Sequence, residues 1–393
     1  MRQVSKSNLG FSLIELMVSA VLGMILVIGA ARLYSIGLKV SWHTSQKAEL
    51  QQDFRAALNI MQHDISLAGA GALGQQGLSN NSVGLPVSGV LPVYPCTGVA
   101  TCNYINGAPV AYPISIAPAR ALYSIIPGPS FGITVNAVAG PTDIITVNYA
   151  DDNLPLNCYQ GTMNATGTAV NFYLPANWAT ICTLPLPGEL APPSLIYSTA
   201  ANAVGLQVGD MIMFGTNTAV GIVTGAAAAC PPAGNLACYT VPFAAGDPGN
   251  INQPGTATGS LVPLENKTLL TAVRLISVTY YLAIPPSTGL PTLMRIQSGQ
   301  FPAPVAENVS YLKFTYDVIN GAGTVYTNQA TLPAGTTPSM ITKVNIAHMA
   351  MRSQAKDNTQ KSSLSQFGGY EGFDLQTSIA ARNLTSQQQY PIN

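Results

Sequence analysis

Glu15 is the residue whose type and position most clearly suggest chemistry, because it is a carboxylic acid inside an apolar run. Residues 11–31 read FSLIELMVSAVLGMILVIGAA and hold no other charge. A carboxylate within a membrane span costs roughly 2.5–3.5 kcal/mol on insertion scales, so it is a functional hypothesis that needs a partner. The chemistry open to Glu15 is an ion pair, and the sequence must supply the cation.

A second candidate is Ser130, in the segment GPSFG (residues 128–132), which fits the G-x-S-x-G nucleophile elbow of hydrolases. That elbow needs a strand before the serine and a helix after it. Here prolines flank Gly128, and a strand-like run follows the serine. Downstream, His348 is the only histidine, and we expect it to be a structural residue of a strand. We therefore expect no enzyme activity.

Metal and cofactor sites find little support. Asp151, Asp152 and Asn153 could offer oxygen ligands to calcium, but no glutamate follows at the required spacing, and a polar turn is favoured. Zinc sites usually bring cysteines or histidines together at close spacing. The three histidines are scattered and no C-x-x-C occurs. We predict neither a metal nor a cofactor.

The six cysteines form three close pairs along the sequence. Six cysteines allow 15 disulfide pairings, and free buried thiols are an alternative. An even number in an exported chain favours disulfides. We favour the three local pairings, each of which would pin a long loop: Cys96 with Cys102, Cys158 with Cys182, and Cys230 with Cys238.

Charge is scarce and unevenly spread. Charged residues make up 8% of the 393 residues, against about 25% in typical soluble domains. Residues 65–264 hold seven charged side chains and are rich in Gly, Pro, Ala, Thr and Asn. Acids and bases balance at 16 each, so a nucleic-acid partner is not predicted. The composition favours a surface outside the cell or packed against other subunits.

The N-terminus predicts a membrane segment. Arg2 and Lys6 precede the apolar run of residues 11–31, which as a helix spans about 30 Å, the thickness of the hydrocarbon core. Basic residues before the span favour a cytoplasmic N-terminus and an exported remainder. A secretory signal peptide would be cut after the run, where the pattern is poor. The alternative cut lies before the run, between Gly10 and Phe11.

The segment GFSLIEL (residues 10–16) resembles the type III signal of type IV pilins and type II secretion pseudopilins. The resemblance implies that a prepilin peptidase cuts after Gly10 and N-methylates Phe11. The chain departs from many relatives in having Leu9, not a basic residue, before the glycine. The resemblance also supplies the cation: the Phe11 amine of a neighbouring subunit would face Glu15. At about 4 Å and a dielectric near 20 the pair attracts by about 4 kcal/mol before desolvation. An anchor helix with an incidental acid is the alternative.

The helical pattern continues beyond the membrane. Seven apolar residues recur at steps of three and four, which indicates one buried helix face; they are Leu50, Phe54, Ala57, Leu58, Met61, Ile65 and Ala68. Gly69 to Gly71 would end the helix. Without an intervening proline, residues 11–68 predict a helix of roughly 87 Å. A coiled coil is the alternative for this stripe.

The rest of the chain predicts short strands. Alternation is clear in residues 312–318, where Leu312, Phe314 and Tyr316 share one face. The segment IPPSTGLP (residues 284–291) predicts a hairpin loop. The predicted strands are Asp143–Tyr149, Asp210–Phe214, Arg274–Ile284, Thr292–Gln297, Val309–Val318, Ile341–Met351 and Phe373–Ala381.

Short segments also resemble one pilin subgroup, the PilW-type minor pilins. Each is weak alone, and their order along the chain makes the resemblance stronger. They are Thr142-Asp143, Val208-Gly209-Asp210, Tyr280-Tyr281, Leu293-Met294-Arg295, the segment 305–309, Phe314-Thr315-Tyr316, Met351-Arg352-Ser353 and Ala381-Arg382-Asn383.

The sequence therefore predicts an α+β fold, in which a long N-terminal helix packs on a mainly antiparallel sheet. The predicted parts are a leader (1–10), a transmembrane helix (11–36), a periplasmic amphipathic helix (37–71), a β- and loop-rich variable insertion (72–264) and a C-terminal sheet region (265–393).

The resemblance implies a structural minor pilin of a type IV pilus that primes assembly near the tip. Its expected partners are prepilin peptidase, other minor and major pilins and, before assembly, the inner membrane. The body would be periplasmic first and then on the pilus at the cell surface. A type II secretion pseudopilin and a tip adhesin whose insertion binds a surface or ligand are the alternatives.

Overall fold

The computed structural model describes residues 12–70, 82–84, 104–105, 108–109, 121–135, 139–151, 154, 156–177, 205–215, 219–231, 237–247, 251–254, 261–297, 302–352 and 372–381. The chain divides into two compact units, Met1–Asp53 and Phe54–Asn393, each described by itself. Helix α1 (Leu13–Ser66) belongs to both. Its 54 residues correspond to about 81 Å.

The end of α1 follows the predicted stripe. Phe54, Ala57, Met61 and Ile65 are buried, because their three- and four-residue spacing places them on one helix face. After Ser66 the chain turns, and Gly69 has a φ of 73°, the left-handed conformation that glycine adopts most readily at a helix C-terminus. The predicted helix and its glycine stop are confirmed.

The described strands form five antiparallel groups. The two pairs are β1 (Ser82–Gly84) with β4 (Ala121–Tyr123), and β2 (Tyr104–Ile105) with β3 (Ala108–Pro109). The central sheet holds β5 (Ile125–Gly128), β6 (Ile144–Ala150), β9 (Met211–Phe214), β10 (Ala219–Ile222), β13 (Ala272–Ala283), β14 (Thr292–Gln297) and β15 (Ala303–Glu307). A separate four-stranded sheet holds β7 (Gln160–Met163), β8 (Ala169–Leu174), β11 (Ala228–Ala229) and β12 (Ala237–Pro242). The C-terminal sheet holds β16 (Val309–Ile319), β17 (Val325–Gln329), β18 (Ile341–Arg352) and β19 (Gly372–Ala380). Short 3₁₀ turns cover Leu156–Cys158, Val262–Leu264 and Pro338–Met340.

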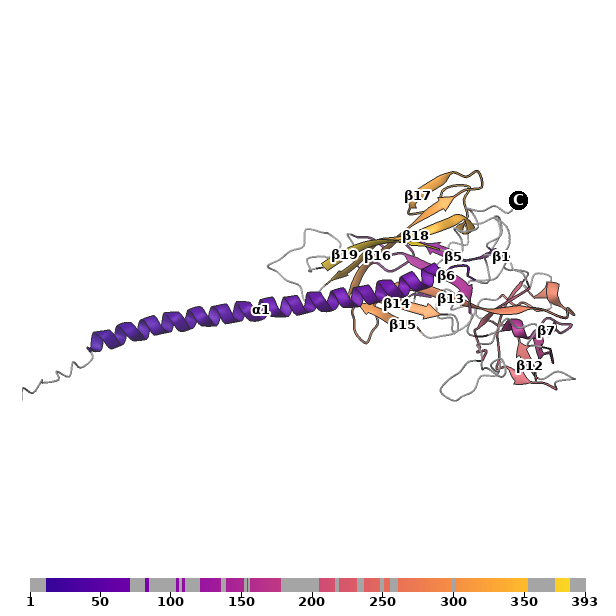
Figure 1. Cartoon of the computed structure of the whole chain (residues 1–393), viewed down its shortest axis with the longest axis horizontal. Coiled ribbons are helices and arrows are strands. Elements are labelled where there is room, and N and C mark those ends of the chain that lie inside the picture. The colour runs from indigo at the N-terminus through magenta and orange to yellow at the C-terminus, as the bar shows by residue number, and fades with distance from the viewer. Residues whose placement is uncertain are drawn as a thin grey trace, which may run out of the picture. The chain divides into compact units, whose positions relative to one another are not determined.

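Strand β13 organises the central sheet. It pairs with β14 through the predicted hairpin, and along its other edge it pairs first with β9 and then with β6. Strands from the middle of the chain and from its C-terminal third thus share one sheet (Figure 1). Both faces of the sheet are covered at β6 and β9, which are buried at every position, whereas the edge strand β15 is mostly exposed.

The C-terminal sheet has the order β17-β16-β18-β19. Leu312, Phe314 and Tyr316 of β16 are buried, whereas Lys313 and Thr315 between them are partly exposed. The alternation predicted for this strand is confirmed. The seven predicted strands correspond to β6, β9, β13, β14, β16, β18 and β19 within one or two residues at each end.

The sheet of β7, β8, β11 and β12 has its own core. Phe172 of β8 stacks beside Phe214 of β9, and Phe214 meets Phe243 edge-to-face. The residues around these rings are buried. This core joins the four-stranded sheet to one face of β9, while Met211 and Met213 on the other face of β9 belong to a second core.

One disulfide closes the edge of that sheet. Cys230 and Cys238 are bonded, as predicted, at the hairpin of β11 and β12. Cys158 is also disulfide-bonded, and its predicted partner Cys182 lies outside the described residues. Cys96 and Cys102 lie there too, so their pairing stays a prediction.

Replacing Cys230 and Cys238 together with alanine should lower the free energy of unfolding by about 2–3 kcal/mol, because the bond closes a short loop in the unfolded chain. Urea unfolding of the full chain in detergent micelles, followed by near-UV circular dichroism, measures this. A midpoint equal to that of the unchanged protein would contradict it.

Candidate processing and assembly site

The first turn of α1 holds Glu15. Its Oε2 accepts the backbone N–H of Ser12 at 3.1 Å, and Ser12 Oγ accepts the backbone N–H of Ile14 at 3.4 Å. This arrangement is a variant of the capping box, in which the glutamate accepts the N–H of the N-cap serine and the serine accepts the N–H of the second helical residue. The S-x-x-E spacing was the signal for it, and sequence reasoning overlooked it. Gly10 and Phe11 lie outside the described residues.

The helix that follows is long and apolar enough to cross a membrane. The candidate span is Leu13–Trp42, 30 residues, and its most apolar window has no buried residue. Large side chains such as Leu13, Leu26 and Leu33 are more than 70% exposed. An isolated subunit in water could not keep such a surface, so a lipid or protein environment must cover it.

The far end of α1 is fixed by a buried carboxylate. Asp64 is 3% exposed. Its Oδ2 accepts hydrogen bonds from the Tyr280 hydroxyl at 2.5 Å and from Arg295 Nε at 2.8 Å. Its Oδ1 accepts one from the Tyr149 hydroxyl at 3.2 Å. These partners come from β13, β14 and β6, which lie beside the end of α1 in Figure 1. We call Asp64, Tyr149, Tyr280 and Arg295 the anchor cluster.

The electrostatics of the anchor cluster agree with a charged pair. Burial, with the nearby charge of Asp64, raises the pKa of Tyr280 and of Tyr149, so both hydroxyls stay protonated donors. Burial alone would lower the pKa of Arg295, but the hydrogen bond and charge of Asp64 outweigh it, and the pKa is raised. The Arg295 guanidinium therefore stays charged at neutral pH, and the two tyrosine hydroxyls stay neutral donors to Asp64.

Alkaline pH should weaken the body through buried tyrosines, and Tyr281 offers a clean test. Burial raises the pKa of Tyr281 to about 12, from 10.0. Between pH 10 and 12 the unfolded chain loses this proton while the folded chain keeps it, so stability falls as pH rises, by about 1.4 kcal/mol per pH unit. Tyr281→Phe should reduce the loss of unfolding free energy per pH unit by that amount, as measured by urea unfolding between pH 10 and 12. Equal slopes in the two proteins would contradict the prediction.

A second buried ion pair links β13 to the ends of its neighbours. Arg274 Nε donates a hydrogen bond to Asp151 Oδ2 at 2.6 Å, and its Nη1 donates one to Asp210 Oδ2 at 3.3 Å. Burial raises the pKa of Asp210, although the N–H of Gln207 and the charge of Arg274 oppose this. Asp151 is 4% exposed. Asp151 directly follows β6 and pairs with Arg274; Asp152 and Asn153 lie outside the described residues, so the polar turn expected for these three residues stays a prediction.

The serine motif lies in a third polar cluster. Ser130 has a φ of 59° in the turn after β5, and Phe131–Ile133 that follow are not helical. Lys313 Nζ donates to Ser130 Oγ at 3.1 Å and to Asp143 Oδ1 at 2.7 Å. Asp143 also accepts the backbone N–H groups of Ser130 and Phe314. Asp143 thus binds both the Lys313 amine and the backbone of the turn that carries Ser130.

His348 is a residue of β18, as expected from the sequence. Its Nδ1 lies 2.8 Å from Oδ2 of Asp374 on β19, and its ring lies beside that of Tyr311 on β16. Among the described residues no group of three or more histidine, cysteine, aspartate or glutamate side chains could hold a metal ion.

The comparisons with known proteins concern the start of the chain. A protein family described as Prokaryotic N-terminal methylation motif matches residues 5–31. No curated protein and no solved structure matches the chain. The motif supports a type IV pilin-like or pseudopilin protein that prepilin peptidase processes, anchored in the inner membrane by one apolar helix.

Proposed function

We propose that this chain is a minor pilin of a type IV pilus, of the PilW type, with a structural and not a catalytic role. Prepilin peptidase cuts it after Gly10 and methylates Phe11, and its body then lies in the periplasm. The subunit joins other minor pilins to prime the fibre and ends near the tip. The observation that carries the proposal is the methylation motif at the head of an exposed apolar helix.

The polar clusters support the PilW-type assignment. Four short segments that resemble this subgroup each contribute a buried or half-buried polar residue: Asp143, Asp210, Tyr280 and Arg295. Each residue bonds an element far away in the sequence. Proteins that share a fold are expected to share the residues that hold it together, so the bonds made by these four segments support the resemblance to PilW-type pilins.

The size of the β body supports a low-copy position. Residues 54–393 form one compact unit, and a body of this size would be awkward to repeat along a fibre shaft. Pseudopilins of type II secretion are usually much shorter, so the length of 393 residues weighs against that alternative.

Two experiments test the proposal: deletion of the gene, and measurement by mass spectrometry of the ratio of this chain to the major subunit in sheared fibres. We expect the deletion strain to lose most of its pili, and complemented fibres to hold far fewer copies of this chain than of the major subunit. Equal copy numbers would contradict the tip position. Loss of protein secretion with intact pili would make the chain a pseudopilin instead.

A further inference from the structure

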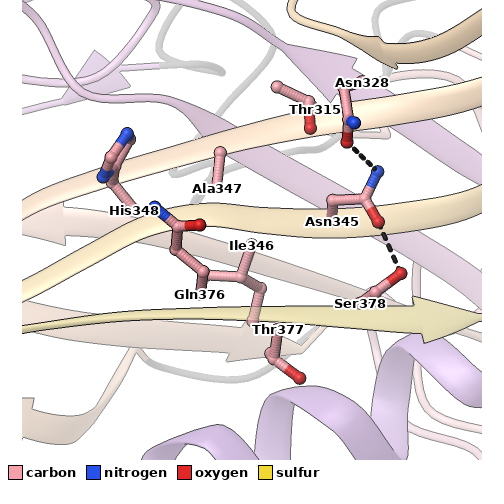
Figure 2. A pocket seen from close by; sticks show the side chains of 9 residues that line it. All are labelled: Thr315, Asn328, Asn345, Ile346, Ala347, His348, Gln376, Thr377 and Ser378. Atoms are coloured by element: carbon pink, nitrogen blue, oxygen red, sulfur yellow. Dashed lines mark hydrogen bonds between the residues drawn. The ribbon is translucent and has the colours of Figure 1, made fainter.

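The C-terminal sheet carries a pocket that the assembly role does not use. Its volume is about 500 Å³, and it opens on a face formed by β16, β17, β18 and β19. Figure 2 shows Asn345 between Asn328 and Ser378, with His348 and Gln376 toward the other end. The pocket is more open than enclosed, so a ligand would lie against the sheet face with part of its surface in solvent.

The floor of the pocket is held rigidly. Asn345 Nδ2 donates to Asp317 Oδ1 at 3.0 Å and to Asn328 Oδ1 at 3.1 Å. Ser378 Oγ donates to Asn345 Oδ1 at 2.5 Å. The chain of bonds crosses all four strands, so the amide cannot rotate without breaking several of them. A prearranged polar surface loses little conformational entropy when a ligand binds.

Other polar groups of the lining are unused. Within the described part of the chain, the side chains of Thr315 and Gln376 form no hydrogen bond. Asn328 uses its side-chain oxygen, which leaves its Nδ2 hydrogens for a ligand. His348 is oriented through Nδ1 by Asp374, and its Nε2 stays available. Amide and hydroxyl groups of this kind both donate and accept hydrogen bonds.

The chemistry of the lining selects the ligand. Apart from His348, every lining side chain is uncharged, and none is a carboxylate, ammonium or guanidinium. Among the lining side chains an anion would find only the His348 ring, and the nearby carboxylates of Asp317 and Asp374 are already held by Asn345 and His348. An apolar ligand would leave the amides unpaired at a cost. A neutral saccharide offers adjacent hydroxyls that both donate and accept. We infer that this pocket binds a neutral saccharide, so that the C-terminal sheet and not the middle of the chain is the adhesive surface.

A glycan array tests the inference. The probe is the full chain, fluorescently labelled, in lauryldimethylamine oxide micelles, because a maltoside detergent would itself compete. The array holds neutral hexose oligosaccharides beside sialylated ones. We expect binding to one or more neutral glycans and weaker binding to their sialylated forms. Binding to no neutral glycan, or stronger binding to the sialylated forms, would overturn the inference.

Variants then place the binding in the pocket. Gln376→Ala removes an exposed polar group and Thr315→Val a partly exposed one. Each should weaken the affinity for the bound glycan about fivefold, as expected for one hydrogen bond. Thr327→Ala, an exposed residue of β17 outside the pocket, is the matched control and should bind like the unchanged chain. Equal affinity in all three variants would place the glycan elsewhere and reject this site.

Discussion

Asp64→Leu is expected to lower the free energy of unfolding of the β body by about 3 kcal/mol. The substitution leaves the guanidinium of Arg295 and the hydroxyls of Tyr149 and Tyr280 without their shared acceptor. Breaking a buried pair by removing one partner typically costs about 3–5 kcal/mol. We expect the lower end because a quarter of the Arg295 side chain reaches solvent. Urea unfolding followed by near-UV circular dichroism measures the loss.

Two comparisons show whether the ion pair is responsible. Asp53→Leu, three helical turns earlier on an exposed position, should change stability by no more than about 0.5 kcal/mol. Asp64→Leu combined with Arg295→Met removes both charges and should recover part of the loss. If Asp53→Leu were as damaging as Asp64→Leu, or if the double variant were no better than the single one, the anchor cluster would not hold α1 as argued.

Glu15→Val is expected to be cut and inserted normally but to be missing from fibres. The valine suits the apolar span, and the cleavage signal around Gly10 is untouched, but no carboxylate is left to pair with the Phe11 amine of a neighbour. Quantitative mass spectrometry of membranes and of sheared fibres separates these steps. Fibre incorporation equal to that of the unchanged chain would contradict the assembly role of Glu15.

Glu15→Gln tells the two roles of this side chain apart. Its amide oxygen can still accept the N–H of Ser12 and keep the capping box, as Gln does at this position, but it carries no charge. We expect it to fail in fibres like the valine variant. If it assembled normally, the capping contact at 3.1 Å would be the main role of Glu15, and the ion pair across subunits would be rejected.

Local patterns predicted the elements well. The helix and seven strands were predicted from the spacing of apolar residues within each segment, such as the stripe through Phe54 and Met61. Strands β8 and β12 were missed because Gly, Pro and Asn surround them and their pairing with each other depends on partners far along the chain. The same limit hid how β6 and β9 meet β13.

The anchor cluster was harder to foresee than the cleavage signal. Residues 10–16 carry their signal within a few consecutive positions. Asp64 stands on the buried stripe, three residues after Met61, and an acid on an apolar face is a sign of a buried partner. Its partner Arg295 is 231 residues away, a separation that no local pattern reveals. A resemblance that quoted Tyr280 and Arg295 pointed to these residues without showing that they meet.

The mass of the N-terminal peptide, from membranes with and without prepilin peptidase, tests the central claim most directly. The account predicts a chain that begins at N-methylated Phe11 when the peptidase is present and at the uncut leader when it is absent. A chain that keeps Met1 in both cases, or that is cut near Ala31, would contradict it, because Glu15 would then have no Phe11 amine to pair with.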